Sequence, residues 1–296
     1  MKRRIFAILF ISALLLSTLT ACDRGEREPY IPRPILLDEV VATYEFGVVF
    51  HRGNALLRNQ VWAALQVLTA DGTVGRIAWT WFGEDVTTIP PNPEATAALG
   101  EVRERAFIVG VDPTSAPKSF WNEAGELVGF DIDLAHAVAE YYGWDLVLLP
   151  IQWADREFEL ASGNVDALWG GITLTELLQQ RLYYIGPYME NRQVVVTMSH
   201  FGIRNLRGLR GRTLALLGDG AAELALEENI TLRERLYELD WQENLFPALL
   251  ALEAGQVDAV LMDEVAALYY IRTGDMEAFG GRGYWMENSQ GAGELR

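Results

Sequence analysis

The order of apolar and polar positions is most regular between residues 105 and 153. The apolar run 107–111 predicts a strand, the spacing over 134–142 predicts a helix, and the run 146–150 predicts a second strand. A strand, a helix and a strand in this order indicate a βαβ-type unit. Ligands of open α/β sheets bind beyond the carboxyl ends of the strands, so we expect the loop 112–121 to belong to a site.

Similar patterns continue on both sides of this unit and predict an α/β fold. The further expected strands are 44–50, 165–171, 193–198, 212–217 and 257–261, and the further expected helices are 55–69, 74–82, 153–160, 173–184, 221–228, 246–254 and 264–271. Gly186 and Pro187 are expected to end the helix over 173–184. The chain has 296 residues, of which 50% are hydrophobic, and this is enough to build the cores of two domains.

The first 22 residues have the pattern of a lipoprotein signal peptide. A basic start is followed by the apolar run 5–19, which is too short for a comfortable membrane span. Leu19-Thr20-Ala21-Cys22 resembles a bacterial lipobox, so we expect Cys22 to carry acyl chains that anchor the protein outside the cytoplasm, in a periplasm or on the outer face of the membrane. The alternative is a simple secretory signal with a chance cysteine. Because Cys22 is the only cysteine, an intramolecular disulfide is excluded.

The net charge of −17 limits the classes of partner. Such an acidic surface repels nucleic acid and anionic lipid headgroups, so neither is an expected partner. His51, His136 and His200 are scattered, and the sequence contains no Cys-His, Ser-His-Asp or metal-ligand cluster. We therefore expect no cofactor, no bound metal and no enzymatic activity.

Two motifs carry a resemblance to a known family. Val-Gly-Val-Asp-Pro at 109–113 and Gly-Glu-Leu-Val-Gly-Phe-Asp-Ile-Asp-Leu at 125–134 resemble the family 3 solute-binding proteins of ABC importers. The resemblance implies a two-lobed periplasmic-binding-protein clamp of type II, acting as a monomer. Such a protein captures a small polar solute, an amino acid or related amine, by lobe closure and passes it to an ABC permease. The alternatives are an enzyme on the same scaffold, of the cyclic-acid dehydratase type, and a sensory or non-binding relic.

The order of segments departs from that family. Residues 44–83 resemble the segment that ends a family member, yet here they precede the first lobe, and this predicts a circular permutation. A fusion in which 35–83 packs poorly is the alternative. Strand 46–50 is expected beside 194–197, with the lobe hinge at 194–197 and 47–50. The expected organisation begins with a signal peptide (1–22), a tether (23–35) and a permuted segment that completes lobe 1 (36–83). A linker (84–105), lobe 1 (106–193), a hinge (194–202), lobe 2 (203–287) and a tail (288–296) follow.

The resemblance also implies a set of ligand-binding residues. These are Asp112, Ser115, Phe120, Gly170, Gly171, Thr173, Gly220 and Asp263. The glycines would offer backbone groups to the ligand, and Asp263 would accept a hydrogen bond from a ligand ammonium. Local alternatives exist, because Asp112 could close a turn and Asp263 could cap a helix.

One family feature is missing. The arginine that would bind a ligand carboxylate corresponds to Leu178, which cannot replace a bidentate guanidinium. The pocket is therefore expected to recognise an ammonium or guanidinium more strictly than a carboxylate, and Asp219 would act in the same direction. The alternative is that Arg181, one helical turn on, or Lys118, at a position where the family usually has Phe, supplies the lost charge.

Overall fold

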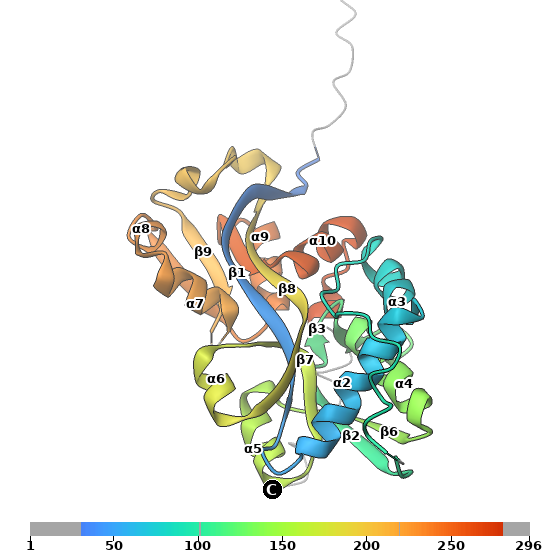
Figure 1. Cartoon of the computed structure of the whole chain (residues 1–296). Coiled ribbons are helices and arrows are strands. Elements are labelled where there is room, and N and C mark those ends of the chain that lie inside the picture. Colours follow the sequence, from blue (N-terminus) through green and yellow to red (C-terminus); the bar gives the residue numbers. More distant parts are fainter. Residues whose placement is uncertain (1–30, 101, 219, 281–296) are drawn as a thin grey trace, which may run out of the picture. The chain divides into compact units, whose positions relative to one another are not determined.

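Two long antiparallel strands, β1 (Pro34–Phe50) and β8 (Tyr183–Met198), run side by side through the fold (Figure 1). They pair from Pro34 opposite Met198 to Phe50 opposite Tyr183. This computed structural model describes residues 31–100, 102–218 and 220–280. The expected signal peptide with Cys22, the greater part of the tether, Asp219 and the tail lie outside the described residues.

β1 and β8 join two parallel half-sheets into one eight-stranded sheet, in the order β10-β9-β11-β8-β1-β7-β2-β6. The outer strands are β2 (Ala106–Val111), β6 (Asp145–Pro150), β7 (Ala167–Thr173), β9 (Thr213–Leu217), β10 (Glu238–Gln242) and β11 (Ala259–Asp263). Pairing within each half is parallel, whereas β7 with β1 and β11 with β8 are antiparallel. We call the half with β2, β6 and β7 lobe 1 and the half with β9, β10 and β11 lobe 2.

Lobe 1 is covered by helices on two faces. These helices are α2 (Ala55–Ala70), α3 (Thr73–Phe82), α4 (Phe130–Tyr142), α5 (Arg156–Ser162) and α6 (Glu176–Arg181). Phe46 and Val48 of β1 join the core beneath α2, α3 and α4, whereas Val49 joins Ile151 and Leu160 on the α5 face. This alternation is the side-chain period of a strand with both faces buried.

The segment 44–83 thus packs into the same lobe as 105–187, as the sequence predicts. The expected register is wrong, however. Strand 46–50 lies opposite residues 183–189 of β8, and 194–197 lie opposite the start of β1. The helix expected over 173–184 is shorter in the structure. α6 extends only from Glu176 to Arg181, and β8 begins at Tyr183. Gly186 and Pro187 do not end an element but lie within β8. They stand opposite the segment of β1 between Phe46 and Val48, where the pairing register shifts. An irregularity of this kind tolerates a proline without an N–H.

Lobe 2 repeats this architecture. Its helices are α7 (Ala221–Glu228), α8 (Ile230–Arg233), α9 (Leu245–Glu253) and α10 (Glu264–Thr273). Val194 and Val196 of β8 face the core under α9 and α10, and Val195 faces the core under α7. β8 therefore belongs to both lobes, and its residues from 193 on pair with β11.

A small second sheet positions the loop that follows β2. It consists of β3 (Thr114–Ser115), β4 (Ser119–Trp121) and β5 (Leu127–Val128), which pair antiparallel. The remaining elements are short 3-10 turns, at Trp153–Asp155, Ser199–Phe201, Leu206–Leu209 and Glu277–Phe279. Within the described ranges, no helix has the length and apolarity needed to cross a membrane.

Candidate ligand-binding site

Lys118 connects the two lobes through its side chain. It occupies the turn between β3 and β4, where its backbone N–H donates to Ser115 and its carbonyl accepts from Asp131. Its side chain is 2% exposed, and its Nζ lies 2.8 Å from Oδ2 of Asp263. The same ammonium lies 4.6 Å from the ring centroid of Phe46. Lys118 therefore joins a lobe 1 loop, strand β1 and strand β11 of lobe 2.

Asp263 ends β11 and stands immediately before α10, the position of a helix cap. Its carboxylate makes no capping hydrogen bond to the helix. Instead it accepts from Lys118 and, at 2.6 Å, from Nε2 of Gln193. The capping alternative is therefore not what the structure shows, because both oxygens of the carboxylate are bonded to side chains outside α10.

A chain of side-chain amides leads from Asp263 into lobe 1. Gln193 donates to Asp263 and also to Oδ1 of Asn191, at 2.8 Å. Asn191 in turn donates to Oγ1 of Thr173 at 3.2 Å. Both amides belong to β8, so this strand carries a hydrogen-bonded path from β7 to β11. Two of the predicted site residues, Thr173 and Asp263, are connected by it.

Asp131, in the first turn of α4, is a member of the cluster that the sequence prediction missed. It is buried, and its Oδ2 accepts from the backbone N–H of Gly171 and from the hydroxyl of Tyr188, each at 3.1 Å. Its Oδ1 has no hydrogen-bond partner among the described residues. Burial raises the pKa of Asp131 to about 7, and the nearby charge of Lys118 opposes that rise. The Gly-Phe-Asp motif was a signal that could have indicated this residue. The sequence prediction used the motif only to identify the resemblance and did not assign its aspartate to the site.

Gly170 and Gly171 allow close approach, and the groups that approach them in the structure come from the protein itself. Gly171 has a φ of +73°, and a Cβ there would lie 2.2 Å from Cε of Lys118. A Cβ at Gly170 would lie 2.9 Å from the backbone nitrogen of Asp112. Any side chain at Gly171 would therefore displace Lys118 from its position.

The loop residues Asp112, Ser115 and Phe120 have structural roles. Asp112 closes a turn, because its Oδ1 accepts from both the N–H and the hydroxyl of Thr114. The packing around this carboxyl raises its pKa. Ser115 pairs with Ser119 between β3 and β4. Phe120 forms edge contacts with Trp81 of α3 and with Tyr269 of α10.

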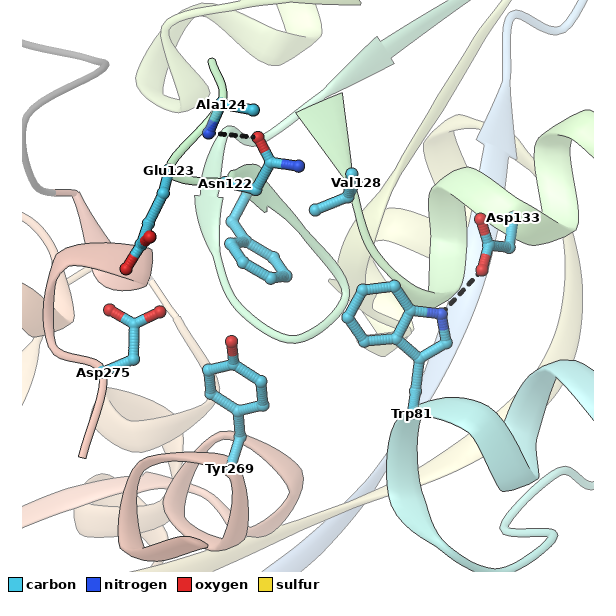
Figure 2. A pocket seen from close by; sticks show the side chains of 9 residues that line it. Trp81, Asn122, Glu123, Ala124, Val128, Asp133, Tyr269 and Asp275 are labelled. Carbon is cyan, nitrogen blue, oxygen red and sulfur yellow. Dashed lines mark hydrogen bonds between the residues drawn. The ribbon is translucent and has the colours of Figure 1, made fainter. Parts of the chain in front are cut away.

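A pocket of about 590 Å³ lies beside this aromatic contact (Figure 2). It is lined by Trp81, Phe120, Asn122, Glu123, Ala124, Val128, Asp133, Tyr269 and Asp275. Trp81 donates its indole N–H to Asp133 at 2.7 Å. The pocket thus receives side chains from α3, the β4–β5 hairpin and α4 of lobe 1 and from α10 of lobe 2.

Three further predicted positions lie apart from Lys118. Leu178 packs against the apolar cluster beneath α5. Arg181 forms an exposed ion pair with Glu157 at 2.7 Å. Gly220 has an extended backbone and stands before the first turn of α7. Of the two cations that could replace the missing guanidinium, only Lys118 reaches the other site residues.

Comparison with known proteins identifies the family. The family model for bacterial extracellular solute-binding proteins, family 3, matches residues 107–243. A structure of an ABC uptake transporter substrate binding protein from Streptococcus pneumoniae with bound histidine is 32% identical to this chain, with a TM-score of 0.54, and the match covers 57% of this chain and 70% of that one. This chain belongs to that family. It is an extracytoplasmic solute-binding protein with the two-lobed α/β fold of the family.

Two other relatives refine the picture. The L-cystine-binding protein TcyJ of Escherichia coli is 27% identical over 199 residues, which are 64% of this chain and 72% of that protein. The cyclohexadienyl dehydratase of Pseudomonas aeruginosa is 30% identical over 82 residues, which are only 28% of this chain and 31% of that enzyme. Similarity to a binding protein is therefore broad, and this similarity to an enzyme is confined to one part. In the part of the chain that the structure describes, no group of three acidic, histidine or cysteine side chains could hold a metal ion.

Proposed function

We propose that this protein binds an amino acid or a related amine between its lobes and delivers it to an ABC permease. The observation that carries the proposal is the carboxylate of Asp263, which makes no helix cap and reaches from lobe 2 to the ammonium of Lys118 in lobe 1. A carboxylate at such a position is a receptor for a ligand ammonium. The relatives named for histidine and cystine support an amino-acid-like ligand.

The proposed site comprises the residues around Asp263 and those that complete the cleft. Gly170, Gly171 and Thr173 would offer backbone and hydroxyl groups from β7, and Gly220 would offer the N-terminal end of α7. Asp112, Ser115 and Phe120 would form a wall, held in place by the turn and the aromatic contacts described above. Lobe closure would occur about β1 and β8, because these strands carry the chain through both lobes.

We also propose that the order of segments arose by circular permutation. β1 is the first of the described strands, yet it lies between β7 and β8 in the sheet, and α2 and α3 complete the helical layer of lobe 1. A permutation preserves such contacts and changes only which ends are joined. The close packing of 34–83 argues against the alternative of a poorly packed fusion relic.

We further propose that the mature protein is a monomer anchored to the membrane through acylated Cys22. The basic start, the apolar run and Leu19-Thr20-Ala21-Cys22 support the anchor. The tether with Pro29 and Pro32, which ends where β1 begins at Pro34, would hold the binding unit away from the membrane.

A ligand screen tests the binding function. Thermal unfolding of the full chain would be followed with each common amino acid, with cystine and with the decarboxylated amine of each. At least one of these compounds should raise the midpoint, because a ligand that binds only the native state stabilises it. A turnover assay with prephenate-like acids tests the enzyme alternative. Turnover of such an acid without stabilisation by any amino acid or amine would overturn the proposal.

A further inference from the structure

The surroundings of the Lys118 ammonium are those of a binding site for an alkylammonium. The carboxylate of Asp263 lies 2.8 Å away, and the face of Phe46 lies 4.6 Å away. The methylene groups run along Gly171, where no other residue would leave room. A carboxylate, an aromatic face and a wall without a side chain are the groups that recognise an organic cation.

The choice of residue at this position is unusual for this chain. The sequence contains only two lysines, Lys2 and Lys118, so every other basic residue of the 24 is arginine. Lys118 is also buried, whereas Arg181, Arg192 and Arg212 keep much of their side chains in water within their ion pairs. A compact ammonium fits between a carboxylate and an aromatic ring, and a planar guanidinium has a different shape and hydrogen-bond geometry.

We infer that Lys118 is a specificity-determining residue that occupies the ammonium subsite at Asp263, so that a cationic ligand must displace it. The inference rests on the proposed function, because it assigns that subsite to Asp263. Lys118 and a ligand ammonium cannot share the subsite, since both need Oδ2 of Asp263 and two like charges at that distance repel each other. Lys118 is thus an internal competitor carried by the binding protein itself.

The competitor sets the affinity and selects the ligand. The apparent affinity of a ligand is its intrinsic affinity multiplied by the fraction of molecules in which its subsite is free. A tethered group competes at an effective concentration of about the millimolar range. Weak monovalent amines would therefore be excluded, and only a solute with further contacts in the cleft would displace Lys118.

Calorimetry on the full chain tests the competition. The probes are L-arginine with agmatine and L-histidine with histamine, and the variants are Lys118→Met, Lys118→Gln and Asp263→Asn. Lys118→Met keeps the apolar stem along Gly171 but removes the ammonium, so it should bind agmatine or histamine at least about tenfold more tightly than the wild type. Asp263→Asn should lose this binding both alone and in combination with Lys118→Met. Arg181→Gln is the matched control, since its exposed ion pair lies apart from Lys118, and it should bind as the wild type does.

The wild-type protein allows a second test that does not depend on the folding of a variant. A brief pulse of an amine-reactive acetylating reagent modifies Lys118, and peptide mass spectrometry measures the modified fraction. Lys118 should react slowly, and a bound amine should increase its reaction, because displacement exposes the ammonium. A lysine-containing reference peptide added to the same reaction corrects for reagent that the free amine consumes.

The outcomes separate the inference from the proposed function. If the wild type binds an amine and Lys118→Met binds it equally or more weakly, Lys118 is no competitor and the inference is wrong. The same holds if the bound amine leaves Lys118 unchanged or protects it further. If neither the wild type nor either Lys118 variant binds any amino acid or amine, the proposed function fails and the inference fails with it.

Discussion

The ammonium of Lys118 lies 4.6 Å from the ring centroid of Phe46, although the two residues belong to segments on opposite sides of the linker 84–105. Phe46 also stacks with Tyr188, whose hydroxyl donates to Asp131. The N-terminal segment therefore contributes to the core of lobe 1 and to the polar cluster between the lobes. A relic with no role in the fold would not hold both positions.

The first prediction follows from this relationship and concerns the stability of the folded protein. Phe46→Ala should lower the free energy of unfolding by about 3–5 kcal/mol, because the ring is fully buried and its removal leaves a cavity. Trp79→Ala is the control on the same segment, since Trp79 is 63% exposed, and it should change stability by about 0.5 kcal/mol or less. Urea denaturation measures both. Equal, small effects of the two substitutions would mean that 34–83 is not part of the cooperative unit.

Much of the fold could be predicted from the sequence, because burial on both faces leaves clear apolar runs. The predicted strand 107–111 corresponds to β2, and the predicted helix over 134–142 corresponds to α4, which begins earlier, at Phe130. β1 was predicted from residue 44, ten residues late. Its first part contains Asp38 and Glu39, which interrupt the apolar pattern although this part pairs with β8.

The candidate site could be predicted only in part. Asp263 and Gly171 were identified from the resemblance, and the structure places both against Lys118. The role of Lys118 could not be predicted, because its partner lies 145 positions away and no local pattern reports such a contact. Asp131 was missed for a similar reason. A buried carboxyl in a first helical turn looks like an ordinary N-terminal acid until its burial and its partner Tyr188 are known.

The second prediction concerns the membrane anchor. Cys22→Ser should release the protein into the soluble fraction, because the acyl chains would no longer be attached. Fractionation of cells followed by immunoblotting measures the distribution. Ser17→Ala, a substitution in the apolar run that keeps the cysteine, is the control and should remain with the membrane. A Cys22→Ser protein that stays bound after a high-salt wash would show that another element provides the anchor.

The third prediction concerns pH. Because burial raises the pKa of Asp131 to about 7, the native protein retains a proton that the unfolded chain releases near pH 4. The contribution of this group to the free energy of unfolding is therefore greatest at acid pH. It falls by up to roughly 4 kcal/mol between about pH 4 and pH 7 and is constant above pH 7. Asp131→Asn cannot ionise, yet its amide oxygen can still accept from Gly171 and Tyr188.

The variant should consequently exceed the wild type in stability at pH 8 and approach it at pH 5. Urea unfolding at several pH values measures the difference between the two proteins, which isolates Asp131 from the other titrating groups. Asp145→Asn removes an exposed carboxylate and should give a curve parallel to that of the wild type. A parallel curve for Asp131→Asn as well would mean that Asp131 is ionised in the native protein throughout this range.

The last prediction concerns the ligand carboxylate. Leu178 has no guanidinium and packs against the apolar cluster beneath α5. Arg181 is paired with Glu157, so neither residue provides a guanidinium for the carboxylate of a ligand bound at Asp263. A hydrogen bond to a charged group contributes roughly 1.5–3 kcal/mol, and its loss should weaken carboxylate recognition by at least about tenfold. An amino acid should therefore bind little more tightly than its decarboxylated amine, and Arg181→Ala should leave both affinities unchanged.

Calorimetry with L-arginine and agmatine compares the two ligands on the wild type, Arg181→Ala and Leu178→Arg. If α6 is placed in the bound state as in the family, Leu178→Arg should improve L-arginine binding and leave agmatine binding unchanged. This substitution also removes an apolar side chain from a packed cluster, so its unfolding curve must be recorded beside its affinity. Tight L-arginine binding by the wild type that is lost in Arg181→Ala would contradict the prediction, because Arg181 would then have left Glu157 to hold the ligand carboxylate.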